Sequence, residues 1–116
     1  MSNLQKNELI QWVHSQFINQ NLTLGFAESC TGGLLSSFVT EQPGSSKYFM
    51  GAVVSYSGKV KNSILDVPVD IMKTYGEVSK EVALKMAQGA KIALHCDWTV
   101  SVTGIAGPSG GTKTKP

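Results

Sequence analysis

Three polar residues in this 116-residue sequence have the types and the order that nucleophilic catalysis uses. Ser29 lies two residues past a short apolar segment that ends at Ala27, Tyr56 ends a second one, and Lys61 lies five residues further along. A serine hydroxyl needs a base to become a nucleophile, and a desolvated lysine can be neutral enough to take its proton. We therefore consider Ser29 as nucleophile, Lys61 as base and Tyr56 as the group that orients them. The alternative that Lys61 is an ordinary solvated surface charge stays open.

The turn after Ser29 is a candidate anion site. If a helix begins there, its first free amides are donors for a phosphate or an oxyanion, and two glycines let a ligand approach the backbone. The alternative is that Ser29 or Thr31 only caps the helix. Cys30 is a rival nucleophile at a helix start, but it has no evident histidine partner, and we regard it as a packing residue that borders the site. The candidate substrate-binding residues of this turn are Cys30, Thr31, Gly32 and Gly33.

A glycine-rich segment, residues 104–116, ends the sequence. Its glycines and hydroxyls suit an anion-binding loop, although it lacks the lysine of a P-loop. Such a loop could share in binding a substrate phosphate. The candidate binding residues here are Thr103, Gly104, Gly107, Gly110 and Gly111.

Composition excludes several other functions. All ten basic residues are lysines, so no motif that needs a guanidinium is present, and a net charge of +2 without a basic block argues against a nucleic-acid partner. Two distant cysteines and two histidines, His14 and His95, disfavour a zinc site and a disulfide framework, and we expect both histidines to be structural. No long apolar run or signal-like start is seen, so we expect no membrane partner and a cytoplasmic location.

The periodicity of apolar residues predicts the elements that must position these groups. Apolar residues at three- and four-residue spacing predict an amphipathic helix from about 3 to 20, with Ile10, Val13 and Phe17 on a buried stripe. Short helices are expected after Gly33, near Lys59 and near Val69, and a longer one over 79–95 with Ser79 as its cap. Strands are predicted over 22–27, 48–56 and 97–103.

Strands that alternate with helices indicate an α/β fold, here a single three-layer α/β/α domain over residues 1–116 with a mostly parallel sheet. Ligands of such sheets bind beyond the carboxyl ends of the strands. Ser29 lies just past the first predicted strand, and Tyr56 and Thr103 end the other two, so we expect the three strand ends to converge on one site.

At these residues the sequence resembles the CinA C-terminal domain family. The family's motifs occur here in order and near the family's spacing, over almost the whole chain from Ala27. The matching blocks are AESCTGGL (27–34), PGSS (43–46), VVSYS (53–57) with Lys61, GEVS (76–79), and VTGIAGP (102–108) with Gly110, Gly111 and Thr112.

The resemblance implies an amidohydrolase of the nicotinamide mononucleotide deamidase type, which converts the nucleotide's carboxamide to a carboxylate and releases ammonia. It places the nucleophile on Ser29, the base on Lys61 and the supporting tyrosine on Tyr56. It also puts the loop after Thr103 in the pocket for nicotinamide mononucleotide or a related nucleotide. No metal or organic cofactor is implied.

Two departures from the family are visible in this sequence. Gly58 stands where the family has asparagine, with Lys59 beside it, and the family domain continues past the glycine-rich loop into a segment that carries arginines. We therefore expect a domain cut short at its C-terminal end. The alternative function is a nucleotide-binding or interaction module without turnover. Exposed strand edges would favour a homo-oligomer.

Overall fold

A parallel three-stranded sheet forms the centre of the protein. The structure, a computed structural model, describes residues 2–105. The strands are β1 (Leu24–Glu28), β2 (Phe49–Val54) and β3 (Trp98–Val102), in the order β2-β1-β3. β1 pairs in parallel with each neighbour. The predicted parallel sheet is confirmed, and the observed strands lie within two residues of the predicted bounds.

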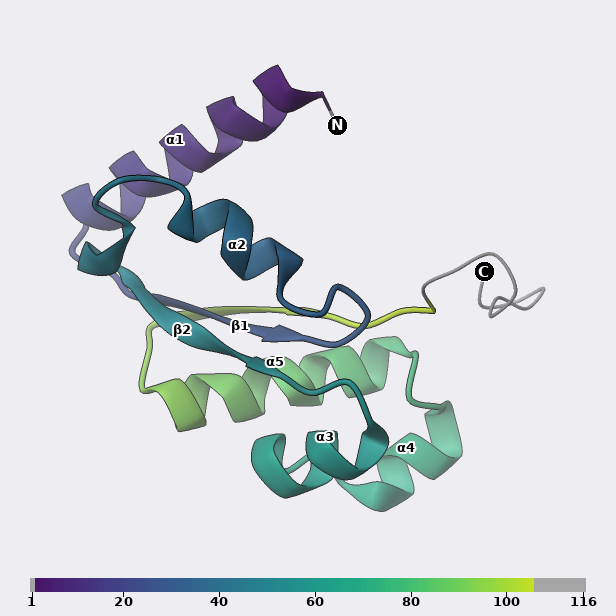
Figure 1. The fold of residues 1–116 in the computed structure, drawn as a ribbon. Helices are drawn as coiled ribbons and strands as arrows, with labels where there is room; N and C mark the ends of the chain where they lie inside the picture. Colours follow the sequence, from purple (N-terminus) through teal and green to yellow (C-terminus); the bar gives the residue numbers. More distant parts are fainter. Residues whose placement is uncertain (1, 106–116) are drawn as a thin grey trace.

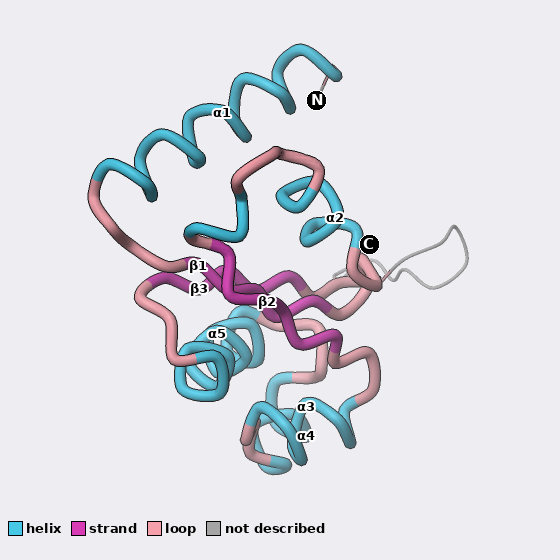
Figure 2. The backbone as a smooth tube through the Cα atoms, turned by 60° about the vertical axis from the view of Figure 1, so that its left-hand side comes forward, coloured by secondary structure: helices cyan, strands magenta, loops and turns pink. Residues whose placement is uncertain are grey.

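Helices cover both faces of this sheet and complete the α/β/α layering predicted from the sequence (Figure 1). α1 and α2 lie over one face, and α5 lies against the other, with α3 and α4 beyond it. Figure 2 shows the same layers from a second direction. The helices are α1 (Asn3–Asn19), α2 (Leu34–Thr40), the short 3-10 helix η1 (Ser45–Lys47), α3 (Gly58–Leu65), α4 (Val69–Tyr75) and α5 (Lys80–Leu94).

The central strand explains why the sheet is stable. All five residues of β1 are buried, as expected for a parallel strand with helices on both faces. On one side Ala27 packs with residues of α3 and α5, among them Leu65 and Met86. On the other side Phe26 and Tyr48 form a second cluster with Val39 of α2. The end of β1 is therefore fixed by two cores.

Side-chain caps set the starts of the helices that position the site. Ser79 Oγ accepts a hydrogen bond from the Val82 amide at 3.2 Å, which confirms the predicted cap of α5. Ser57 Oγ accepts one from the Val60 amide at 3.2 Å and starts α3 in the same way. These caps fix the first turn of each helix.

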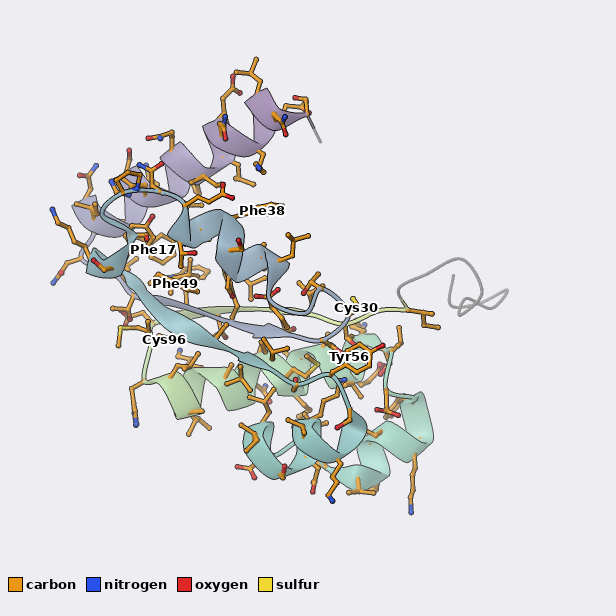
Figure 3. The ribbon with its side chains drawn as sticks, in the orientation of Figure 1. Phe17, Cys30, Phe38, Phe49, Tyr56 and Cys96 are labelled. Carbon is orange, nitrogen blue, oxygen red and sulfur yellow. The ribbon has the colours of Figure 1, made fainter. Side chains whose placement is uncertain are left out.

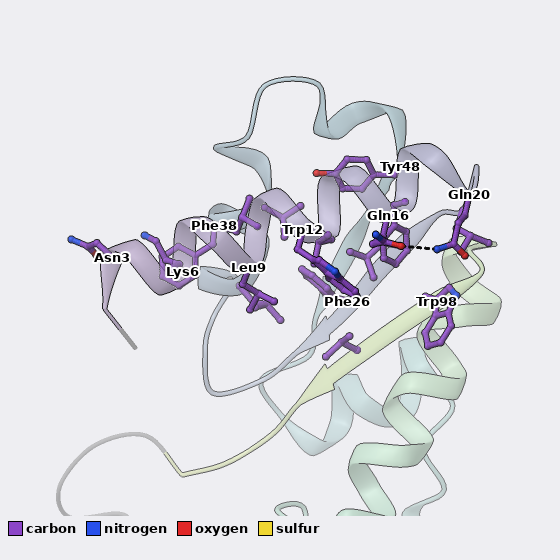
Figure 4. Close-up of a pocket in the computed structure, with 18 residues that line it drawn as sticks. Asn3, Lys6, Leu9, Trp12, Gln16, Gln20, Phe26, Phe38, Tyr48 and Trp98 are labelled. Carbon is purple, nitrogen blue, oxygen red and sulfur yellow. Dashed lines mark hydrogen bonds between the residues drawn. The ribbon is translucent and has the colours of Figure 1, made fainter.

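α1 differs from the prediction. None of its residues is fully buried, and the residues of the expected stripe that face inward, Val13 and Phe17, are only partly covered. A cavity of about 720 Å³ separates α1 from the sheet, bordered by Trp12 of α1, Phe26 of β1 and Trp98 of β3 (Figure 4). The stripe exists, and Val13 and Phe17 pack against the cluster of Phe26 and Tyr48, but beside the cavity it is not fully buried. No helix within residues 2–105 is long and apolar enough to cross a membrane.

Candidate active site

The carboxyl ends of the three strands meet at one edge of the sheet, as predicted. The Ser29 amide donates to the Val102 carbonyl at the end of β3 at 3.0 Å. The Ser55 amide, just after β2, donates to the Glu28 carbonyl at 2.7 Å. Figure 3 shows Cys30 and Tyr56 at this same end of the molecule. Residues that follow β1 and β2 are thus brought together although they are far apart in sequence.

α3 carries Lys61 into this edge. Lys61 and Leu65 are four residues apart, so they share one helical face, and both are buried. Lys61 is only 2% exposed and Ser29 only 4%. The Lys61 Nζ lies 2.8 Å from Ser29 Oγ. The alternative that Lys61 is a solvated surface charge is therefore wrong.

Two backbone carbonyls orient the lysine amine. Nζ donates to the Ser55 carbonyl and to the Tyr56 carbonyl, each at 3.0 Å. A neutral amine has two N–H donors and one lone pair. When the two N–H groups donate to the two carbonyls, the lone pair can accept a hydrogen bond from the Ser29 hydroxyl. In the ammonium form the third N–H donates to Ser29 Oγ instead. The two carbonyls can therefore hold Nζ beside Ser29 Oγ both before and after the amine takes the proton.

Burial also adjusts the acidity of this lysine. Removal from water disfavours the ammonium form and lowers the pKa of Lys61 below its ordinary value of 10.5. The electrostatic influence of Glu77, and to a smaller extent that of Cys30, acts in the opposite direction and offsets part of this. The net effect is a lysine whose neutral form is more accessible than that of a surface lysine.

Tyr56 meets the pair through its main chain. Its carbonyl accepts from Lys61 Nζ, and Ser29 Oγ lies 3.5 Å from the same oxygen. Its side chain is 73% exposed. The expected orienting role is therefore filled by the backbone, and the phenol points toward solvent at the edge of the site.

Glu28 occupies the helix start that was predicted to bind an anion, and this corrects the expectation. Its buried carboxylate accepts hydrogen bonds from the amides of Gly33, Leu35 and Ser36 at 3.0 to 3.2 Å. The hydroxyls of Thr31 and Ser36 also donate to it. The first amides of α2 are thus used inside the protein. Neither Ser29 nor Thr31 caps α2, so that alternative is wrong too.

The Glu28 carboxylate is ionised despite its burial. Burial raises the pKa of Glu28, but the hydrogen bonds from Ser36, Thr31 and Leu35 outweigh it, and the pKa lies below its ordinary value of 4.5. Sequence reasoning missed this residue. The available signal was a carboxylate in the turn before a helix, a position where negative charge is favourable.

Two other amides are available as oxyanion donors. Within residues 2–105 the amides of Cys30 and Thr31 have no hydrogen-bond acceptor. The amide directly after a nucleophilic serine is a common oxyanion donor in hydrolases. The turn that presents them needs glycine, because Gly32 and Gly33 have φ angles of +63° and +111°. Cys30 itself is partly buried and free.

The remaining predicted binding residues follow β3. Thr103 Oγ1 donates to the Glu77 carbonyl at 3.2 Å, so this hydroxyl fastens the link between α4 and α5. Gly104 lies beside Cys30, where an added Cβ would be 3.2 Å from its Sγ. Both residues therefore border the Ser29 turn. Gly107, Gly110 and Gly111 lie outside the described residues.

No metal site accompanies the pair in the described part of the chain: no three His, Cys, Asp or Glu side chains there gather closely enough to hold an ion. The cavity beneath α1 is lined mainly by apolar groups and contains neither Ser29 nor Lys61. His14 of that region is structural, since its Nδ1 lies 3.2 Å from the Tyr48 hydroxyl. The candidate chemistry is therefore confined to the sheet edge.

These features define an α/β domain with a buried serine–lysine pair at the carboxyl edge of a parallel sheet. The family model described as the CinA C-terminal domain matches residues 6–116. The chain therefore belongs to the CinA C-terminal domain family, as its motifs indicated.

Relatives of known sequence and structure agree with this assignment. The chain is 50% identical over 101 residues to a CinA-like protein of Prochlorococcus marinus (strain MIT 9515), covering 87% of this chain and 23% of the relative. It is 54% identical over 98 residues to a CinA-like protein of Leptospira interrogans (serovar Lai), covering 84% and 23%. The chain thus spans about a quarter of the length of these curated relatives.

Crystal structures of relatives have the same fold. The competence/damage inducible protein CihA of Agrobacterium tumefaciens superposes with a TM-score of 0.92 at 40% identity, over 96% of this chain and 67% of that one. A competence-damaged protein (CinA) superfamily protein of Escherichia coli gives 0.92 at 31% identity, over 100% and 68%. At these identities the likeness includes the sequence as well as the fold.

Proposed function

We propose that this domain is an amidohydrolase that converts nicotinamide mononucleotide to nicotinate mononucleotide and ammonia by a serine–lysine mechanism. The observation that carries the proposal is the 2.8 Å contact between Lys61 Nζ and Ser29 Oγ in a buried site. The lowered pKa of Lys61 supports a role as base. The substrate follows from the family resemblance.

Acylation starts with attack of Ser29 Oγ on the carboxamide carbon. Lys61 takes the hydroxyl proton as the C–O bond forms, and the amides of Cys30 and Thr31 donate to the oxyanion that develops. The lysine ammonium then gives its proton to the amide nitrogen. The C–N bond breaks, and ammonia leaves an acyl-enzyme on Ser29.

Deacylation repeats the proton transfers with water. Lys61, neutral again, takes a proton from a water molecule that attacks the ester carbon. The ammonium returns that proton to Ser29 Oγ as the C–O bond to serine breaks. The product is a carboxylic acid, which releases its proton to solvent and becomes the carboxylate, and serine and lysine are restored.

An ammonia-release assay on nicotinamide mononucleotide tests the proposal. We expect Ser29→Ala to lose at least about 10²-fold in kcat, because within residues 2–105 the hydroxyl that hydrogen-bonds to Lys61 Nζ is that of Ser29. Ser37→Ala, an exposed serine on α2, is the matched control and should retain full activity. Cys30→Ala should also remain active if serine rather than cysteine is the nucleophile. Absence of ammonia from the parent, or undiminished release by Ser29→Ala, would refute the assignment.

A binding module without turnover is the second candidate. The observation that favours it is that Glu28 consumes the first amides of α2, which leaves fewer donors for a transition state. Calorimetry distinguishes the two functions. Binding of the nucleotide without any product after long incubation would support the module, and Ser29-dependent turnover would exclude it.

A further inference from the structure

Glu77 lies in the link between α4 and α5, and its carboxylate packs on the first turn of α3. The contact is possible because residue 58 is glycine. A Cβ built on Gly58 would lie 2.8 Å from the Cδ of Glu77 and 3.4 Å from its Oε2. Side-chain atoms do not approach a Cβ as closely as 2.8 Å. The glycine therefore provides the space that the carboxylate occupies.

The backbone around Glu77 is fastened at two points. Thr103 Oγ1 donates to the Glu77 carbonyl at 3.2 Å, and Ser79 Oγ donates to the neighbouring Gly76 carbonyl at 2.8 Å. Thr103 follows β3, so the first bond ties this link to the same sheet edge that holds Ser29. Glu77 is consequently held at the site by its own main chain.

The position of the carboxylate brings it near the lysine. Residues 58 and 61 are three apart on α3, so a group that covers Gly58 neighbours Lys61 on the helix surface. Lys61 Nζ itself is in contact with three neutral oxygens, so Glu77 acts on it through its electric field. Glu77 is the larger of the two electrostatic influences that raise the pKa of Lys61, and Cys30 is the smaller.

We propose that Glu77 is a positioning residue that stabilises the positive charge Lys61 acquires when it takes the Ser29 proton. The inference rests on the serine–lysine reaction proposed above. Only the proton moves in this step, from Ser29 Oγ to Lys61 Nζ, and Glu77 stays ionised throughout. Gly58 makes this position of Glu77 possible, because any side chain at residue 58 must displace the carboxylate.

Three variants test this role. Glu77→Gln removes the charge, Gly58→Ala displaces it by the added Cβ, and Glu81→Gln removes a carboxylate from the first turn of α5 that does not act on Lys61. An NMR titration of the Lys61 side chain, assigned by comparison with Lys61→Met, reports its protonation without any substrate. We expect Glu77→Gln and Gly58→Ala to lower the measured pKa of Lys61 by roughly half a unit, the size typical of a partly solvated charge pair.

The pH dependence of catalysis should shift in the same direction as the pKa of Lys61. The acid limb of the kcat/KM profile should move to lower pH in both variants. The plateau kcat should fall by roughly two- to fivefold, because the lysine becomes a weaker base. Adding Gly58→Ala to Glu77→Gln should cause no further shift, since the charge is already gone. Glu81→Gln should move neither the limb nor the titration.

The two proposals fail in different ways. If the parent releases no ammonia but the Lys61 titration shifts in Glu77→Gln and Gly58→Ala, the reaction is wrong and the coupling is real. If the titration of Lys61 is the same in the parent and both variants, the role of Glu77 is overturned whatever the activity.

Discussion

Glu28 and Ser36 join the end of β1 to the first turn of α2, because one carboxylate oxygen accepts from both the amide and the hydroxyl of Ser36. The other oxygen accepts from Thr31, Gly33 and Leu35. The turn that bears Ser29 lies between these two anchor points. Its shape is therefore set by a buried charge that does not itself touch the reacting groups.

Replacing this charge should destabilise the fold. Glu28→Gln keeps the size of the side chain but places an amide NH₂ where an oxygen now accepts from N–H and O–H donors. Since hydrogen bonds to buried charged groups are strong and unpaired buried donors are costly, we expect a loss of about 2–3 kcal/mol in the free energy of unfolding. Urea denaturation measures it. Thr40→Ala, at the exposed end of α2, is the control and should change stability little. Equal stability of Glu28→Gln and the parent would contradict this account.

Acid should weaken the fold through the same group. The pKa of Glu28 is lower in the folded than in the unfolded protein, so the unfolded chain takes up the proton first as the pH falls. The contribution to stability is complete above the ordinary value of 4.5 and is lost as the pH drops through the lower folded value. Denaturation midpoints measured from about pH 6 down to about pH 3 should fall more steeply for the parent than for Glu28→Gln. Parallel curves would show that other carboxylates dominate.

The elements of the fold were largely predictable because local signals agree with the tertiary structure. Ser79 caps α5 as expected, and the apolar run of β1 matches a strand buried on both faces. The parallel order then placed Ser29 and the residues after β2 at one edge. α1 shows the limit of such reasoning: periodicity identifies which face turns inward, but the distance between α1 and the sheet depends on packing that periodicity does not encode.

The electrostatics of the site were less predictable. The burial of Lys61 had a weak signal, since it shares a helical face with Leu65, but burial depends on α3 docking against α5. For the Glu28 carboxylate the signal was weak, a negative charge just before a helix. Glu77 gave no usable pattern, because it acts on a lysine that only the fold brings near. For Tyr56 the sequence indicated the residue but not that its carbonyl, rather than its phenol, meets the lysine.

Activity should rise with pH as Lys61 loses its proton. The base must be neutral to accept the Ser29 proton, and burial places its pKa below 10.5, so kcat/KM should increase as the pH rises through that lowered value. Tyr56→Phe should leave the position of this limb unchanged, because the carbonyl that contacts Nζ is retained. Lys61→Arg should lose at least about 10²-fold at every pH, since a guanidinium does not deprotonate. A limb that moves in Tyr56→Phe would assign the phenol a direct part in proton transfer.

The close approach of α3 and α5 that delivers Lys61 depends on Gly89. A Cβ at this position would meet the backbone carbonyl of Leu65 at the end of α3, with the carbonyl carbon only 2.8 Å away. Alanine is the better helix former by about 1 kcal/mol, but backbone cannot yield as a side-chain end can. We therefore expect Gly89→Ala to lower the free energy of unfolding by about 1–3 kcal/mol in urea denaturation. Gly58→Ala is the matched control: the atoms nearest its Cβ belong to the flexible end of Glu77, which can move aside, so its stability should equal or exceed that of the parent. If Gly89→Ala proves as stable as Gly58→Ala, the two helices do not pack as closely as described.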